Sequence, residues 1–279
     1  MLLFAALVSV SFSLGGRAAP YIDPSALTAA RFLLAGVVIG GLAASRMKRA
    51  HFRASWRYLA LGGLISGYFI LMFEALRITD PVSTGAVFTL TPVMSAGFGW
   101  LLMRQQVTGR MALSLALASV GAVWVIFRAD VDAILGLRLG RGEALFFIGC
   151  ALHALYTPLG RMLNRGEPLL VYTFGSIVGG LIVTGIYGAR PLMETEWSAL
   201  PPIVWAALFY LALGATAITF FLIQFATLRL PSAKVMAYGY LIPCFVILWE
   251  GLFGGSWVAA PVWLGVAATV GALLLLLRD

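Results

Sequence analysis

The sequence carries little charge for its length. Only 11% of its 279 residues are Asp, Glu, Lys or Arg, whereas 61% are hydrophobic and the mean hydropathy is +0.97. Soluble domains carry about a quarter charged residues, so this composition excludes an ordinary water-soluble protein and indicates a surface that faces lipid. The net charge of +8 lies mainly in short segments between apolar runs, which argues against a nucleic-acid partner.

Residues that build disulfides, metal centres and catalytic sites are also scarce. The two cysteines, Cys150 and Cys244, both lie inside apolar runs, so we expect no disulfide framework. The sequence has no zinc-ligand spacing, no nucleotide-binding loop and no nucleophile elbow. It therefore predicts no cofactor, no metal and no catalytic residue, and it argues against both an enzyme and an ATP-driven pump.

Long hydrophobic runs are what the chain does contain. Ten of them are candidate membrane spans: residues 2–19, 25–45, 57–76, 83–103, 110–128, 143–162, 168–188, 202–223, 234–254 and 259–277. Each is close to the ~20 residues that a helix needs to cross ~30 Å of hydrocarbon. The runs are continuous rather than alternating, which favours helices over barrel strands. We therefore predict an all-α integral membrane protein with ten transmembrane helices.

An internal repeat organises these spans. A shift of 151 positions places Pro92 on Pro243, and the register holds without a gap over residues 63–107. Corresponding proline-interrupted spans in two halves indicate a secondary transporter and point to its binding site. We predict two five-helix repeats, 1–130 and 140–279. Because proline removes a helical hydrogen bond, we also predict irregular helices near both prolines, beside a central cavity.

The charges of the loops indicate that the two repeats have opposite orientations. The loop after the seventh span carries Arg190 together with Glu194 and Glu196. Its counterpart after the second span is basic, with no acidic residue: Arg46, Lys48, Arg49, Arg53 and Arg57. The positive-inside rule places this basic loop, and both termini, in the cytoplasm. An odd number of spans in each repeat then predicts an inverted repeat.

Three segments resemble a known family. They are Pro24–Phe32 (PSALTAARF), Ala75–Pro92 (ALRITDPVSTGAVFTLTP) and Ala226–Pro243, which begins ATLRLPSAKV. On these residues the whole chain resembles the ten-helix drug/metabolite transporter superfamily, and its EamA-type members in particular. The chain departs from the family at Ser9–Ser13, where Trp-Gly is common, and at Arg104–Gln106, where Gly-Glu often ends helix 4.

The resemblance implies a basket-like fold of two inverted halves. It implies a central cavity lined mainly by helices 1, 3, 4, 6, 8 and 9. It also implies transport of a small organic metabolite across the inner (cytoplasmic) membrane of a bacterium, more commonly by export.

Charged residues inside the spans need an explanation, because a charge at mid-membrane costs about 2.5–3.5 kcal/mol on insertion scales. Arg31, Glu74 and Glu250 all fall in the predicted outer leaflet. We predict one charge network of these three residues, and Glu74, His153 and Glu250 are the candidates for proton coupling. The alternatives are a structural or snorkelling role for Arg31, a local ion pair of Glu74 with Arg77, and solvation of Glu250 at the interface.

The sixth span contains a candidate polar patch. His153 lies near mid-depth, and its titration near neutral pH suits proton coupling or contact with a polar substrate. The alternative is a neutral histidine bonded to a helix carbonyl. Tyr156 follows one turn later, and Pro158 frees a backbone carbonyl upstream. Gln224 in the eighth span is either a further polar contact or an interhelical hydrogen bond.

Aromatic residues near the repeated prolines complete the predicted substrate site. An aromatic wall with a few polar groups is the usual form of a small-molecule site. The predicted site residues are Tyr68, Phe88, Thr91, His153, Tyr156, Gln224, Tyr238, Tyr240 and Trp249. This mixture suits an amino-acid-like metabolite. A multidrug exporter of hydrophobic cations is the alternative, and a polytopic membrane enzyme is a less favoured one.

The expected partners are the lipid bilayer, the small-molecule substrate and, for coupled transport, protons. The sequence leaves open the direction of transport, the choice between proton coupling and facilitated diffusion, and the choice between monomer and homodimer.

Overall fold

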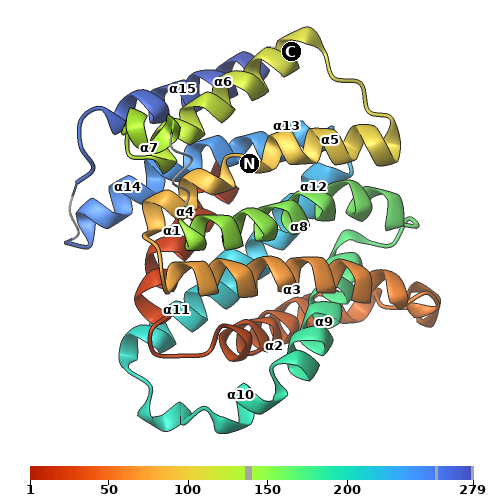
Figure 1. The fold of residues 1–279 in the computed structure, drawn as a ribbon. Helices are drawn as coiled ribbons and strands as arrows, with labels where there is room; N and C mark the ends of the chain where they lie inside the picture. Colours follow the sequence, from red (N-terminus) through yellow and green to blue (C-terminus); the bar gives the residue numbers. More distant parts are fainter. Residues whose placement is uncertain (136–139, 255–256, 278–279) are drawn as a thin grey trace.

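The computed structural model describes residues 1–135, 140–254 and 257–277. The described residues form helices and no strands, so the predicted all-α fold is confirmed. Eight described segments are long and apolar enough to cross a membrane, and Leu2–Ala18 and Val262–Leu276 are two shorter apolar helices. These segments correspond to the ten predicted spans. Most of the long helices run in roughly the same direction across Figure 1.

The helices follow one another with short connections. The first half contains α1 (Leu2–Ala18), α2 (Pro24–Ala43), α3 (Trp56–Leu76), α4 (Pro81–Phe88), α5 (Thr91–Met103), α6 (Gly109–Ile126) and α7 (Val131–Leu135). The second half contains α8 (Arg141–Leu163), α9 (Leu169–Tyr187), α10 (Ala189–Glu194), α11 (Pro202–Ala212), α12 (Thr219–Thr227), α13 (Ser232–Ala237), α14 (Ile242–Leu252) and α15 (Val262–Leu277). Short 3₁₀ turns occupy Ala44–Arg46, Arg49–Phe52, Trp197–Ala199 and Tyr238–Leu241, and a π-helix occupies Leu213–Ile218.

Two helices in the first half begin at an Asp-Pro pair. The Asp23 carboxylate accepts a hydrogen bond of 2.8 Å from a backbone N–H in the first turn of α2, and Pro24 is the first helical residue. Asp80 and Pro81 begin α4 in the same way, with a hydrogen bond of 2.9 Å. The aspartate satisfies a donor that the helix leaves unpaired, and proline does not need its missing N–H at this position. These pairs fix where the two helices start.

The fourth and ninth spans are both interrupted, and at matching positions. In the fourth span α4 ends at Phe88 and α5 begins at Thr91, with Pro92 as its second residue. In the ninth span a 3₁₀ turn precedes α14, which has Pro243 as its second residue. A proline is tolerated in the first turn of a helix but not in its interior. The repeated prolines therefore each begin a new helix within a span. Pro158, in contrast, lies inside α8, which continues to Leu163.

The two halves of the chain pack against each other extensively. The helix α3 packs on α8 and α9, α2 packs on α9, α1 packs on α11 and α14, and α5 packs on α8 and α13. The pair α6 and α15 lies along one side of the molecule, which is at the top of Figure 1. A large cluster of buried apolar side chains extends from α1 to α14. This core surrounds the site described below.

The contact of α3 with α9 brings two backbones together. A Cβ atom added to Gly62 would lie 2.1 Å from the backbone nitrogen of Gly180 and 2.2 Å from the carbonyl carbon of Gly179. Helices in membranes commonly use small residues to approach each other this closely. Gly62 is therefore required by the packing between the first half of the chain and the second.

Candidate functional site

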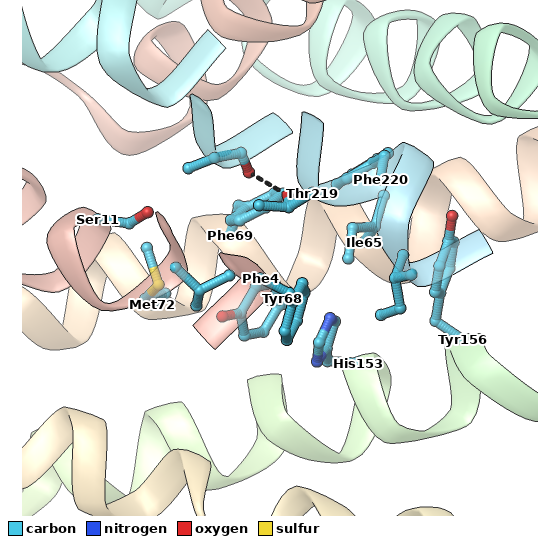
Figure 2. Close-up of a pocket in the computed structure, with 13 residues that line it drawn as sticks. Phe4, Ser11, Ile65, Tyr68, Phe69, Met72, His153, Tyr156, Thr219 and Phe220 are labelled. Atoms are coloured by element: carbon cyan, nitrogen blue, oxygen red, sulfur yellow. Dashed lines mark hydrogen bonds between the residues drawn. The ribbon is translucent and has the colours of Figure 1, made fainter. Parts of the chain in front are cut away.

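A small enclosed cavity lies where α1, α3, α8 and α12 meet (Figure 2). Its wall consists of Phe4, Val8 and Ser11 of α1, Ile65, Tyr68, Phe69 and Met72 of α3, His153 and Tyr156 of α8, and Ala215, Thr219, Phe220 and Ile223 of the eighth span. Its volume is about 20 Å³, room for about one water molecule. The cavity is therefore closed in this structure, and a larger molecule can enter only if the helices around it separate.

Aromatic rings surround the imidazole of His153. The Tyr68 ring is stacked on it with centroids 4.4 Å apart, and the two side chains lie next to each other in Figure 2. Phe88 contacts the same imidazole at 5.3 Å and Tyr156 at 6.5 Å. His153 is 5% exposed, and its Nδ1 has no hydrogen-bond partner. The wall of the cavity thus holds an imidazole that the rings position and whose Nδ1 is unpaired.

The side chains of Tyr156 and Gln224 are joined by a hydrogen bond. Gln224 Nε2 donates to the Tyr156 hydroxyl at 2.8 Å, which links α12 to α8. The predicted alternative for Gln224, an interhelical hydrogen bond, is what the structure contains. The carbonyl oxygen of the Gln224 amide and the hydroxyl of Thr157 are buried without partners. Since buried polar atoms are rarely unpaired, these two atoms are notable exceptions, and each lies in or next to a residue of the Tyr156–Gln224 pair.

Several predicted site residues do not line the cavity in this conformation. Phe88 lies behind Tyr68, with ring centroids 6.0 Å apart, and Thr91 donates to the Phe88 carbonyl at 2.7 Å across the helix interruption. Trp249 donates to the Ser9 hydroxyl at 2.9 Å and so ties α14 to α1.

Tyr238 and Tyr240 also lie outside the cavity wall, in a cluster of side chains from α5, α6, α13 and α15. The physical reason is the interruption of the ninth span, which directs these aromatic side chains against neighbouring helices.

The three membrane-embedded charges do not form the predicted network. Glu74 pairs with Arg77 at 3.5 Å on an exposed helix end, as its local alternative predicts. Glu250 pairs with Arg17 of α1 at 3.0 Å. Arg31 has no acidic partner among the described residues. Each acid has a closer cation than Arg31, so helix adjacency rather than membrane depth decides the pairing.

Arg31 instead binds the π-helix of the eighth span. Its Nε and Nη2 atoms donate to the Thr216 hydroxyl at 2.9 and 2.7 Å. Nη2 also donates to the carbonyl oxygens of Ala215 at 3.1 Å and Leu211 at 3.4 Å. A π-helix has its own irregular hydrogen bonding, and such segments often occur at functional sites. The guanidinium stacks on the Phe69 ring at 3.7 Å, a favourable cation–π arrangement.

Sequence reasoning missed three features of the structure. Ser11 lines the cavity, and its hydroxyl has no partner; the serine-rich departure from the family pattern was its only signal. The pair of Arg17 with Glu250 connects α1 to α14. A second pair joins Arg57 of α3 to Glu167 in the loop before α9 at 2.5 Å. Each pair joins residues from different halves of the chain, and a single sequence carries no signal for such contacts.

The comparisons with known proteins agree with this architecture. The profile of the EamA-like transporter family matches residues 1–127 and 140–278. The chain is 25% identical to "Uncharacterized transporter YyaM" of Bacillus subtilis (strain 168) over 252 residues, which is 88% of this chain and 82% of that protein. It is 24% identical over 236 residues to an uncharacterized transporter of Archaeoglobus fulgidus, with 81% and 78% of the two chains covered.

A crystal structure of a protein superposes with a TM-score of 0.75 at 20% identity, covering 99% of this chain and 94% of the other. At this identity the likeness concerns the fold alone.

Proposed function

Because the chain belongs to the EamA-like transporter family and is thus a membrane transporter, we propose that it moves a small, amino-acid-like metabolite by alternating access. It acts as a secondary transporter and exports this metabolite across the bacterial inner membrane, with both termini in the cytoplasm. The transporter names of its relatives support a transport role rather than catalysis.

The observation that carries this proposal is the composition of the cavity wall. Five of its thirteen residues are Phe or Tyr, while Ser11 Oγ and His153 Nδ1 are buried there without partners. An unpaired buried polar atom costs about 1–3 kcal/mol, and a polar group on a ligand removes that cost. Such a wall suits a molecule with an apolar part and a few polar groups.

Alternating access is supported by the closed cavity and by the ion pairs on either side of it. By the proposed topology, Arg17 and Glu250 tie α1 to α14 toward the outer face. Arg57 and Glu167 tie α3 to the loop before α9 toward the inner face. Rocking one half against the other breaks one pair while the other holds, which opens the cavity to one side at a time.

His153 is the coupling candidate in this scheme. It lines the cavity, whereas Glu74 is exposed at a helix end and Glu250 is already paired. A histidine in contact with water gains and loses a proton near neutral pH. His153 therefore suits a proton that crosses with the substrate or against it when the cavity opens. Facilitated diffusion is the alternative, and it predicts transport that does not depend on this residue's titration.

A hydrophobic cation is the second candidate substrate. The apolar rings of Phe4, Phe69 and Phe220 favour it. The described wall residues include no carboxylate to balance a cation, and for this reason we rank the metabolite first.

A thermal-shift screen tests the proposal. The purified protein is melted with amino acids, related metabolites and lipophilic cations, and hits are then measured for flux into liposomes. A substrate stabilises the folded state by mass action, so its melting temperature rises with dose. Stabilisation and flux by amino-acid-like compounds support the proposal. Stabilisation and flux by lipophilic cations alone replace it with the multidrug alternative.

A further inference from the structure

The guanidinium of Arg31 carries a positive charge that no acid among the described residues balances. The ion pairs among the described residues are formed by other arginines. The hydrogen-bond partners of Arg31 are a hydroxyl and backbone carbonyls, all neutral. Arg31 is 0% exposed within a membrane span. Charged residues in such positions are normally paired or line a functional cavity.

One arm of this guanidinium is also unused. Nε and Nη2 donate to the π-helix, but Nη1 is buried with no hydrogen-bond partner. An arginine presents its donors as a planar fork, which matches the two oxygens of a carboxylate. The local structure therefore supplies both a positive charge and a free donor in one buried group.

Arg31 lies directly behind the cavity wall. The Phe69 ring covers the guanidinium at 3.7 Å, and the same ring lines the cavity (Figure 2). The carbonyl of Ala215 accepts hydrogen bonds from Arg31 and, at 2.9 Å, from the Thr219 hydroxyl. Ala215 and Thr219 are both wall residues. A single layer of side chains, chiefly the Phe69 ring, thus separates the guanidinium from the cavity.

We propose that Arg31 binds a carboxylate of the transported molecule. This inference rests on the proposed transport function and names its substrate class, a small organic acid or zwitterion. When the cavity opens, the Phe69 side chain turns aside and the substrate carboxylate forms a charge-assisted hydrogen bond with Nη1. The apolar part of the substrate then lies against the rings of Tyr68 and Phe220. The same positive charge disfavours a cationic substrate.

A purely structural role for Arg31 is the competing explanation, since it holds the π-helix in place. Thr216 separates the two roles. Thr216→Val removes the hydroxyl that accepts from Nε and Nη2, but it leaves the charge and the free Nη1 of Arg31 unchanged. A structural role predicts that T216V and R31Q change binding of all ligands alike. A substrate role predicts that only R31Q changes the preference for a carboxylate.

The experiment uses a matched panel of probes on the full-length protein. The probes are the twenty standard amino acids, the amide of each and the amine that each yields on decarboxylation. Affinity is read from dose-dependent thermal shifts, and flux from proteoliposomes, for the wild type, R31Q, R31K and T216V. A hydrogen bond to a charged group changes affinity by about tenfold or more. The wild type should therefore bind an acid about tenfold or more tightly than its amide.

The variants then locate the origin of this preference. R31Q should abolish the acid-over-amide ratio. R31K should retain part of it, because lysine keeps the charge but loses the planar fork. T216V should lower the melting temperature and keep the wild-type ratio. If R31Q does not fold, the test rests on two results: the acid-over-amide ratio of the wild type and the reduction of this ratio in R31K.

Three results would overturn the proposal. In the first, the wild type binds and transports amides or amines as well as acids. This result rejects Arg31 as a carboxylate site but leaves the proposed transport function intact. In the second, R31Q keeps the wild-type ratio of acid to amide affinity, or R31K keeps it if R31Q does not fold. This result also rejects the carboxylate site alone. If neither the panel nor lipophilic cations bind or move, the proposed transport function fails and this inference fails with it.

Discussion

The imidazole of His153 is stacked on the phenol ring of Tyr68, with ring centroids 4.4 Å apart and planes inclined by 23°. Tyr68 belongs to α3 in the first half of the chain, and His153 belongs to α8 in the second. Their rings therefore join the two halves at the wall of the cavity. Any rocking of one half against the other has to shear or separate this pair.

Replacing His153 should impair transport more than folding. His153→Phe keeps a ring for the stack and removes the unpaired nitrogen, so the rate of flux should fall about two- to tenfold, as expected for one lost hydrogen bond to the substrate. Under proton coupling the pH dependence of the flux should also flatten, because phenylalanine cannot take up a proton. Flux measured over a series of pH values checks both effects. Glu74→Gln is the matched control and should behave like the wild type, because Glu74 is exposed and paired locally.

An H153F variant that transports at the wild-type rate with the wild-type pH profile would contradict the role of His153. A changed rate with an unchanged pH profile would keep His153 as a substrate contact and favour facilitated diffusion.

The pair of Arg57 with Glu167 should make stability depend on pH. Burial alone raises the pKa of the Glu167 carboxyl, but hydrogen bonds from Arg57 and from the Arg165 backbone outweigh it and hold the pKa below the usual 4.5. A carboxyl with a lowered pKa in the folded state stabilises the protein fully above the unfolded pKa. This stabilisation is lost as the pH falls through the folded pKa.

Glu167→Gln should therefore destabilise the protein by about 1–3 kcal/mol at pH 7. Melting experiments on wild type and E167Q at neutral pH and at decreasing acidic pH measure the difference. The gap between the two proteins should begin to shrink near pH 4.5, where the carboxyl of the unfolded chain takes up a proton. It should close as the pH falls through the lowered pKa of the folded state. A gap that stays constant down to the lowest accessible pH would show that the charge of Glu167 contributes nothing.

The close approach of α3 and α9 should make two neighbouring glycines behave differently. A Cβ at Gly62 would clash with the backbone of Gly179 and Gly180, whereas a Cβ at Gly63 meets nothing within 4 Å. Gly62→Ala should destabilise the protein by about 1–3 kcal/mol or more. Gly63→Ala, the matched control, should be neutral or stabilising by up to about 1 kcal/mol. Thermal unfolding in detergent compares them, and equal melting temperatures would contradict the observed packing.

The proposed topology predicts which single cysteines face the outside. In a background with Cys150 and Cys244 replaced by serine, Tyr21→Cys and Ser198→Cys should react with a membrane-impermeant maleimide in intact cells. Ser55→Cys should react only after the membrane is opened. All three positions are exposed, so burial does not confound the labelling. The reverse pattern would reject cytoplasmic termini, whereas labelling of Ser55→Cys and Ser198→Cys from the same side would reject the predicted inverted repeat.

The fold could be predicted from the sequence largely because membrane spans are set by length and hydropathy. The interruptions of the fourth and ninth spans also lie at Pro92 and Pro243, the two prolines that the repeat singled out. The π-helix at Leu213–Ile218 had no comparable signal. Nothing in its composition distinguishes it from an ordinary apolar helix.

The candidate site was harder to predict because lipid-facing and buried helix faces are both apolar. The sequence therefore does not fix how each helix is rotated; packing against its neighbours does. Tyr68, His153 and Tyr156 line the cavity, but Tyr240 and Trp249 pack elsewhere. The predicted charge network was wrong for a related reason. The sequence indicates how deep a residue lies in the membrane, but it does not indicate which helices are neighbours.

Flux through the cavity tests the central claim most directly. Three proteins are reconstituted in liposomes: the wild type, Ser11→Leu and Ser119→Leu. The substrate is the amino acid that gives the largest thermal shift. The liposomes are loaded with this amino acid unlabelled, and entry of its labelled form is measured without nucleotide. Ser11 lines the cavity, whereas Ser119 lines an exposed groove between α5 and α6. The account predicts saturable counterflow for the wild type and S119L, and flux at the level of protein-free liposomes for S11L, with all three proteins folded. Wild-type flux in S11L, or no counterflow in the wild type, would contradict it.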